Sequence, residues 1–359
     1  MRRIIVTGLM LLLATGCTPA AAPIVTDPPA PSPVSPGPAT SLPVPSITPS
    51  ANDEQFTTLD AIELSEPTAL PAAWSEVFTL PYGDAPERLG TSLGGDGEGL
   101  QWGPSYGTAV PDGTWWFLDT AHRRLAHYSD TGDYLGETLI PQQHLAQGEY
   151  VQYAVPLALA DGTVVLQSST PDDPGMLLMS PTGEFTRVVL PGFVAVKGTD
   201  GSSLYGFGED GGPAQIDPRT GTITAVDAFT DQNVDDYALA VGPGRVTITR
   251  PGFSLDLPVT MAGNPAAVVH PSIEAAVGTD DVLNLLVVGL VEETPGEIVE
   301  LAGFVRINAD GLGLSEPVRP LTSPSDPADG LRLGVRLSDR LPWLMAIDTD
   351  AVRVYRRSA

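Results

Sequence analysis

Val-Pro-Asp-Gly-Thr-Trp-Trp-Phe-Leu-Asp, residues 110–119, joins a tight turn to a run of strand-forming residues. The turn is Pro111-Asp112-Gly113, and the run extends from Thr114 to Leu118. An Asp-Gly pair supplies the positive φ that a tight hairpin needs, and β-branched and aromatic residues favour strands. This stretch therefore predicts a hairpin turn that leads directly into a β-strand.

The same unit of turn and strand recurs along the chain. Its turns are Pro111–Gly113, Ala160–Gly162, Thr199–Gly201, Gly242–Gly244 and Thr279–Asp281. The last residues of these turns are 49, 39, 43 and 37 positions apart. One four-stranded blade of a β-propeller uses about 40–50 residues, whereas a sandwich has no reason to repeat at that interval. The spacing therefore predicts an all-β fold of the propeller type.

A second series of turns joins the next two strands of each unit. Its members are Asp130–Gly132, Pro181–Gly183, Arg219–Gly221 and Ala309–Gly311. The last unit has only three strand-like runs, at residues 331–335, 342–347 and 351–355. A free run at Ser75–Leu80 is available as the fourth strand, and its pairing would remove exposed sheet edges. We predict six blades of four strands in a ring closed by this N-terminal strand, with five or seven blades as alternatives.

One unit carries a sharper likeness. Gly103–Tyr128 has a Gly-Pro-x-Gly-like opening, an Asp-Gly turn, an aromatic strand that ends at Asp119, and a turn that ends at Arg124. This pattern resembles an NHL-type propeller repeat. The resemblance implies that Asp119 and Arg124 tie the turn together, and His122 departs from the small polar residue usual at its position. It supports the architecture rather than an activity, since one fold hosts many functions.

Residues 1–16 read as an export signal. Arg2 and Arg3 precede an apolar run from Ile4 to Ala14, which is too short to cross a bilayer. Leu13-Ala14-Thr15-Gly16-Cys17 is similar to the lipobox of bacterial lipoproteins, although a larger residue is usual where Ala14 stands. The resemblance implies cleavage after Gly16 and addition of fatty-acyl chains, such as palmitate, at Cys17. The alternative is an ordinary secretory signal followed by a free thiol.

The next segment, residues 17–72, is predicted to be a tether. From Thr18 to Ser50, 11 of 33 residues are proline, which blocks helix and sheet hydrogen bonds. Such a linker extends at up to about 3.1 Å per residue. Within the transition to the domain, Phe56–Leu64 is expected either as a short helix or as a segment along the domain surface. The propeller domain is expected to span residues 73–359.

Charge restricts the partners. Without Arg2 and Arg3, 16 basic residues remain against 44 acidic ones, a net charge of −28. This charge repels nucleic acid, and we predict no nucleic-acid partner. Lys197 is the only lysine, a bias typical of high-GC genomes such as those of actinobacteria. With the lipid anchor, these features predict the extracytoplasmic face of the cell membrane.

Motifs for chemistry are weak. Asp231, Asn233 and Asp235 place oxygen ligands at alternate positions, as calcium loops do, but Asp236 stands where such loops have glycine. The G-x-S-x-G at residues 103–107 and the G-x-G-x-x-G at residues 206–211 both lead into strands rather than helices, so they are interpreted as hairpin elements. We predict no catalytic residue and no cofactor, with calcium at this acidic stretch as the open alternative.

Two function classes follow. The sequence favours a membrane-tethered, non-catalytic binding module for a protein, glycan or small ligand of the cell envelope. The alternative is an extracytoplasmic, metal-dependent hydrolase that resembles propeller lactonases, whose ion would need carboxylates converging from several blades. The aromatic residues of the first unit, Trp102, Tyr106, Trp115, Trp116 and Tyr128, are expected to fill the space between blades rather than line a binding mouth.

Overall fold

The computed structural model divides the chain into two units, Met1–Asp53 and Glu54–Ala359. All residues described below belong to the second unit. They are residues 56–64, 74–90, 92–93, 101–102, 104–145, 151–168, 173–192, 194–208, 212–225, 232–234, 237–265, 267–278, 280–294, 297–318, 331–336, 341–347 and 351–357.

These residues confirm the all-β prediction, since their helical structure is limited to one short 3-10 turn, η1 (Gln142–His144). The first sheet contains β5 (Pro104–Ala109), β6 (Trp115–Asp119), β7 (Arg124–Tyr128) and β8 (Tyr134–Leu139). The second contains β9 (Tyr153–Ala158), β10 (Val164–Ser168), β11 (Gly175–Met179) and β12 (Phe185–Val189). The third contains β13 (Val194–Thr199), β14 (Leu204–Gly208), β15 (Pro213–Ile216) and β16 (Ile223–Ala225).

Three further sheets follow the same plan. The fourth contains β17 (Gln232–Val234), β18 (Tyr237–Gly242), β19 (Arg245–Arg250) and β20 (Phe253–Met261), with β1 (Ile62–Leu64) at its edge. The fifth contains β21 (Val269–Val277), β22 (Leu283–Thr294), β23 (Glu297–Ile307) and β24 (Gly313–Val318). The sixth contains β25 (Leu331–Arg336), β26 (Leu341–Ile347), β27 (Ala351–Arg357) and β2 (Trp74–Pro81). A small hairpin pairs β3 (Ser92–Leu93) with β4 (Gln101–Trp102).

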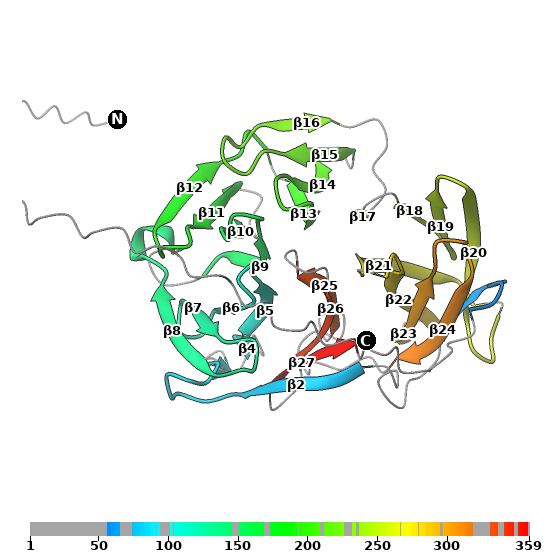
Figure 1. Cartoon of the computed structure of the whole chain (residues 1–359), viewed down its shortest axis with the longest axis horizontal. Helices are drawn as coiled ribbons and strands as arrows, with labels where there is room; N and C mark the ends of the chain where they lie inside the picture. The colour runs from blue at the N-terminus through cyan, green and yellow to red at the C-terminus, as the bar shows by residue number, and fades with distance from the viewer. Residues whose placement is uncertain are drawn as a thin grey trace, which may run out of the picture. The chain divides into compact units, whose positions relative to one another are not determined.

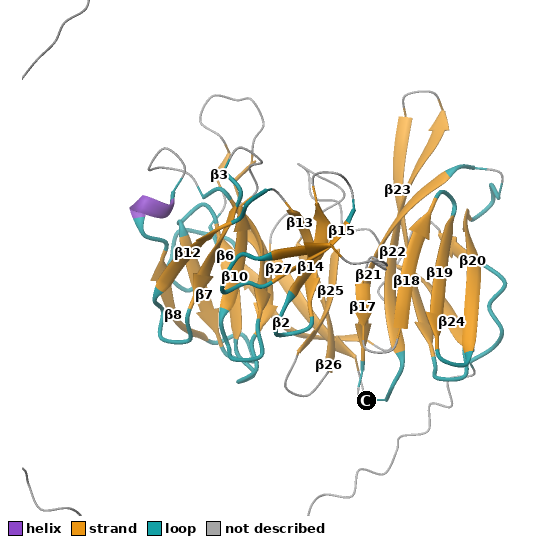
Figure 2. Cartoon of the chain, turned by 90° about the horizontal axis from the view of Figure 1, so that it is seen from above, coloured by secondary structure: helices purple, strands orange, loops and turns teal. Residues whose placement is uncertain are grey.

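The sheets are arranged as in a β-propeller. Their first strands lie toward the middle of the unit and their last strands toward the outside (Figure 1). Five of the six pairs of neighbouring first strands are in contact: β5 with β9, β9 with β13, β17 with β21, β21 with β25, and β25 with β5. Consecutive strands within each sheet are antiparallel, so the sheets present their strand ends on two opposite faces (Figure 2).

We call these two faces the turn face and the connection face. The turn face carries the turns between first and second strands and between third and fourth strands of each sheet. The connection face carries the links between second and third strands and between successive sheets. Glycines on the turn face adopt positive φ, for example 94° at Gly113, 85° at Gly162 and 87° at Gly132. The prediction that Asp-Gly and Thr-Gly pairs form the tight turns is therefore confirmed at these positions.

One predicted turn has a different position in its sheet from the other members of its series. Gly242–Gly244 does introduce a strand, as predicted, but it joins β18 to β19, the second and third strands of the fourth sheet, whereas the other turns of the series join first to second strands. Gly244 has φ 66°, so the local turn chemistry was interpreted correctly. The difference is not evident from the sequence, because Pro-Gly pairs occur at two successive turns of this sheet, Pro243-Gly244 and Pro251-Gly252, and turn chemistry does not tell them apart.

The two ends of the domain meet in the sixth sheet. β2 pairs antiparallel with β27, with Leu80 opposite Val352 and Trp74 opposite Arg357. The run predicted at residues 75–80 as the missing fourth strand thus does complete the three C-terminal strands. A β-bulge shifts the register between Glu76 and Phe78. This pairing joins parts of the chain that are far apart in sequence.

Phe56–Leu64 is extended rather than helical. Ile62–Leu64 pairs in parallel with Val259–Met261 of β20, and both Ile62 and Leu64 are fully buried. The compact unit begins at Glu54, earlier than the domain start expected at residue 73, because these side chains belong to its core. Phe56–Leu64 is called the strap below.

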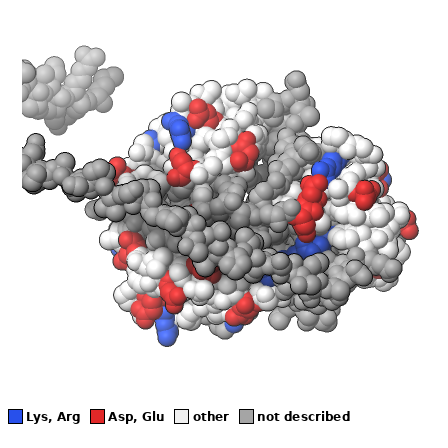
Figure 3. Space-filling view, in the orientation of Figure 1, with Lys and Arg blue, Asp and Glu red and all other residues white. Residues whose placement is uncertain are grey.

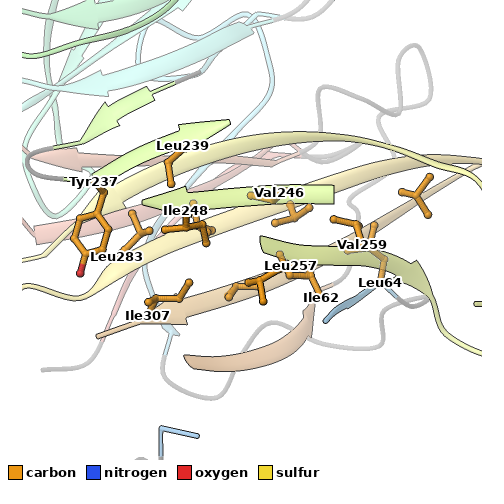
Figure 4. Packing of buried hydrophobic residues seen from close by; sticks show 14 of the residues in the cluster. Ile62, Leu64, Tyr237, Leu239, Val246, Ile248, Leu257, Val259, Leu283 and Ile307 are labelled. Carbon is orange, nitrogen blue, oxygen red and sulfur yellow. The ribbon is translucent and has the colours of Figure 1, made fainter. Parts of the chain in front are cut away.

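Apolar clusters fill the spaces between neighbouring sheets. The cluster between the fourth and fifth sheets includes residues of β1, β18–β20 and β21–β23 (Figure 4). The cluster between the first and sixth sheets contains Phe78, Trp115, Phe117, Tyr128 and Trp343. Burying such side chains stabilises the fold by about 1.5–3 kcal/mol each relative to exposure. Alternation along each strand places these residues on sheet faces that are covered by the next sheet.

Candidate functional site on the connection face

A buried ion cluster lies at the connection-face end of the first sheet. Asp119, the last residue of β6, is fully buried. Its Oδ2 accepts hydrogen bonds from Arg124 Nε at 3.0 Å and from the backbone N–H of Gly90 at 3.1 Å, and it lies 2.8 Å from His122 Nδ1. The ion pair between Asp119 and Arg124 is the contact that the NHL resemblance implied.

Arg124 links this cluster to the segment that follows β2 of the sixth sheet. Its guanidinium also pairs with Glu137 of β8 and donates to the backbone oxygen of Arg88. Burial works to lower the pKa of Arg124, but the hydrogen bonds and charges of Glu137 and Asp119 outweigh it and raise that pKa. Arg124 in turn lowers the pKa of Glu137. The cluster therefore holds residues 88–90, which follow β2, against the first sheet.

A second polar cluster lies on the connection face of the second sheet. It comprises His144 at the end of η1, Gln152 and Tyr153 at the start of β9, Asp173 before β11, and Arg187 in β12. We call it the Tyr153 cluster. The Arg187 guanidinium pairs with Asp173 Oδ1, and Gln152 Nε2 donates to Asp173 Oδ2 at 2.9 Å. Two connections that are separate in sequence, before β9 and before β11, are thus joined through one carboxylate.

Two polar atoms of the Tyr153 cluster are buried. The hydroxyl belongs to Tyr153, which is only 5% exposed and interacts with the side chain of Gln152, and Nδ1 of His144 has no hydrogen-bond partner within the described part of the chain. Burial raises the pKa of Tyr153. Burial, and then the charge of Arg187, lowers the pKa of His144, which favours the neutral imidazole.

The charged members of this cluster are accessible. Side-chain exposure is 47% for Asp173 and 26% for Arg187. The Asp173 pKa is lowered, first by the hydrogen bond from Arg187 and then by that from Gln152. An ionised carboxylate beside a guanidinium offers acceptors and donors within one small area. Such a pair suits a ligand that carries hydroxyl or amide groups, which both donate and accept.

The turn face carries ion pairs between sheets. Arg219 of the third sheet pairs with Asp161 of the second at 2.7 Å, and Arg250 of the fourth pairs with Asp281 of the fifth at 2.7 Å. Basic side chains in Figure 3 lie beside acidic ones rather than in a patch of their own. These pairs link neighbouring turns. The pair of Arg219 and Asp161 is exposed on both sides and is expected to contribute little to stability.

The predicted calcium ligands are only partly within the described chain. Asn233 lies in β17, where its backbone is opposite Ala238 of β18. Asp231 and Asp235 lie outside the described residues, so calcium at this stretch stays a prediction. In the part of the chain that the structure describes, no three His, Cys, Asp or Glu side chains gather where they could hold a metal ion.

Cys17 and the signal and linker before Asn52 lie outside the described residues, so lipidation also stays a prediction. The described segments contain no helix long and apolar enough to cross a membrane.

The four histidines lie at separate places. His122 and His144 belong to the two clusters above, and His270 is exposed on β21. His127 Nε2 lies 2.8 Å from Thr114 Oγ1, and its ring stacks on Trp116 with centroids 4.0 Å apart.

The aromatic residues of the first sheet have a packing role. Tyr106, Trp115 and Tyr128 are at most 3% exposed, as expected for residues that fill the space between sheets. Trp116 is half-buried and faces the second sheet's cluster. The side chain of Trp102 lies outside the described part.

His127 makes stability depend on pH. Burial lowers its folded-state pKa below the ordinary 6.5. The unfolded chain therefore binds the proton more tightly, and stability present at pH 7 is lost as the pH falls below about 6.5. We expect His127→Gln, which keeps a polar group near Thr114 without the charge, to reduce the difference in unfolding free energy between pH 7 and pH 5. Urea titrations at the two pH values measure it, and an unchanged difference would contradict the assignment to His127.

Several solved structures are similar to this chain. A streptogramin B lyase is 16% identical, with a TM-score of 0.38, over 71% of this chain and 94% of its own. A catalytically inactive virginiamycin B lyase from Staphylococcus aureus, with quinupristin, is 13% identical, with a TM-score of 0.41, over 79% of this chain and 100% of its own. Regucalcin from Agrobacterium tumefaciens, a calcium-binding protein, is 13% identical, with a TM-score of 0.37, over 71% of this chain and 91% of its own.

At these identities and TM-scores the likeness assigns neither an activity nor a site to this chain. No curated protein sequence matches it. A family model does match, over residues 72–357, which is most of the chain. Its description is a domain of unknown function, DUF7485. The matched residues include all six sheets of the unit but not the strap. The chain therefore belongs to the DUF7485 family.

Proposed function

We propose that the protein is a lipid-anchored, extracytoplasmic binding module of a bacterial cell envelope. Its domain is a six-bladed β-propeller closed by β2, and Cys17 holds it at the outer side of the cell membrane. The connection face binds a protein, glycan or small ligand of the envelope. The domain binds this partner without converting it.

The observation that carries this proposal is the side on which the chain enters the domain. Thr57, at the start of the strap, exchanges two backbone hydrogen bonds with Gly313, at 2.9 and 2.7 Å. Gly313 opens β24 directly after the turn at residues 308–312, which belongs to the turn face. The first described residues of the chain thus lie on the turn face, opposite the face that carries the Tyr153 cluster, and this supports the connection face as the one that meets a partner.

Support for the six-bladed ring comes from the sheets themselves. Each of the six has four antiparallel strands in the same order, apart from the added β1, and β2 completes the sheet of the C-terminal strands. The first and sixth sheets share a core in which Trp115 and Trp343 pack edge to face, with ring centroids 5.3 Å apart. In a closed ring, every sheet has a neighbouring sheet on both of its sides.

The test compares two faces and the anchor. In a bacterial host, the wild-type protein is expected to sediment with membranes, and Cys17→Ala is expected to move it to the soluble fraction. Envelope partners are then cross-linked to purified protein, with Asp173→Ala/Arg187→Ala as the connection-face variant and Asp161→Ala/Arg219→Ala as the matched turn-face control. Each variant removes one exposed ion pair.

We expect the connection-face variant to lose at least about 90% of the cross-linked partner, as hot-spot pairs do, and the turn-face control to retain it. If the turn-face variant lost the partner and the connection-face variant retained it, the binding surface would lie on the turn face and the proposal would be wrong. Membrane association that survives Cys17→Ala would contradict the anchor.

A further inference from the structure

The strap contacts the domain through few backbone hydrogen bonds. Thr57 and Gly313 form one isolated bridge, and Ile62–Leu64 pairs with the outer edge of β20. At the end of the strap, the N–H of Ala262 donates to the backbone oxygen of Leu64 at 2.7 Å. β20 is already paired with β19 along its other edge. Departure of the strap would therefore break its pairing with β20 but leave the pairing of β17–β20 with one another intact.

Side chains of the strap are inserted between two sheets. Ile62 and Leu64 are fully buried, while Glu63 between them is exposed. They lie in the apolar cluster that also contains Leu257 and Val259 of β20 (Figure 4). Leu59 packs against the same cluster. The strap thus uses alternate apolar residues as anchors and turns its charged residue to solvent.

Glycines in the fifth sheet make the room for these anchors. A Cβ atom at Gly289 would lie 2.4 Å from Leu64 Cδ1, and one at Gly303 would lie 2.9 Å from Leu64 Cδ2. A Cβ atom at Gly313 would lie 2.1 Å from Leu59 Cδ1. Glycine inside a strand weakens it and marks a place where another group approaches closely. β22, β23 and β24 each carry one, so all three form a slot shaped for the strap.

We propose that the slot between β20 and β22–β24 is a peptide-binding groove, and that the chain's own strap is its releasable ligand. The groove takes an extended segment by parallel β-addition, and it selects apolar side chains at the positions of Leu59, Ile62 and Leu64. Docking and release give the tether two lengths. Release frees residues 56–73, which adds up to about 55 Å of chain at about 3.1 Å per residue.

The groove and its ligand follow from contacts within the domain alone. The change in tether length rests on the proposed anchor at Cys17. The experiments therefore use the mature full-length chain with Cys17→Ala, in the absence of membranes and of any partner for the connection face. Their outcome is independent of whether that face binds an envelope component.

Hydrogen exchange tests release in the unmodified strap. The amides of Thr57, Gly313 and Ala262 are protected only while the strap is docked. We expect them to exchange at least about tenfold faster than the amide of Ile248 in β19, through a local opening that is insensitive to low urea. Exchange of both groups at one common rate, through global unfolding, would overturn the proposal.

A peptide added in trans tests the groove. In the variant Ile62→Asp/Leu64→Asp the chain's own strap is disabled, and a peptide with the sequence of residues 54–66 is expected to bind saturably and raise the melting temperature. Glu63→Ala, on the exposed side of the strap, is the matched control and is expected not to bind the peptide. A folded double variant that ignores the peptide would overturn the proposal. If that variant does not fold, the exchange rates decide.

Discussion

Replacing Asp119 with asparagine is expected to lower the free energy of unfolding by about 3 kcal/mol. The carboxylate is fully buried and accepts hydrogen bonds from Arg124 and Gly90, at 3.0 and 3.1 Å. Its neutral replacement leaves the guanidinium of Arg124, 4% exposed, as a buried charge whose remaining carboxylate partner among the described residues is Glu137. Removing one partner of a buried ion pair costs about 3–5 kcal/mol, and Glu137 places this case at the low end.

Urea denaturation followed by tryptophan fluorescence measures the effect. Glu137→Gln is the matched control, because it removes the charge of the second carboxylate that pairs with Arg124. The side chain of Glu137 is 35% exposed. We expect the control to cost about 1 kcal/mol or less, as for exposed pairs. Equal losses for the two variants would show that burial of Asp119 is not what matters. A variant that also removes the charge, Asp119→Asn/Arg124→Met, is expected to recover part of the lost stability.

Trp115→Ala is expected to cost about 3–5 kcal/mol, as for other large aromatic residues truncated in a core. Trp115 is 1% exposed and lies between the first and sixth sheets. Its ring packs edge to face on Phe78 of β2 at 5.7 Å and on Trp343 of β26 at 5.3 Å, between centroids. The cavity would open where the N-terminal strand and the C-terminal strands meet the first sheet.

The neighbouring tryptophan provides the control. Trp116 points to the other face of β6, is half-buried, and stacks on His127. We expect Trp116→Ala to cost less than about 1.5 kcal/mol, the usual range for partly exposed contacts. Thermal and urea unfolding of the two variants side by side give the comparison. A larger loss for Trp116→Ala would contradict the assignment of the junction core to Trp115.

Local chemistry was enough to predict much of the architecture. Gly113, Gly162 and Gly132 require positive φ, and this requirement is carried by the residue and its neighbours alone. The run at residues 75–80 was recognisable as a strand without a partner, because the last unit had only three strands. Where two turns share the same chemistry, as at Pro243-Gly244 and Pro251-Gly252, local rules did not tell which strands of the sheet each turn joins.

The candidate site was not predictable in the same way. His144, Tyr153, Asp173 and Arg187 come from separate elements of the chain and match no motif with fixed spacing. Nothing near Asp173 in sequence indicates its pairing with Arg187. Asp119 and Arg124, by contrast, lie five residues apart on neighbouring strands, and their pairing was implied by the repeat that contains them.

Sequence alone determined the strand content, the tight turns and their repeat, because backbone φ preferences and side-chain alternation act over a few residues. It also predicted the anchor at Cys17 and the linker, which depend on composition and order. Only the tertiary structure decided that Phe56–Leu64 is extended and that its last three residues form a strand. Its three-residue β1 carries too weak a propensity signal of its own, and it is held by the glycine slot of the fifth sheet, more than 200 residues later. The same holds for the Tyr153 cluster, whose contacts exist only after the second sheet has formed.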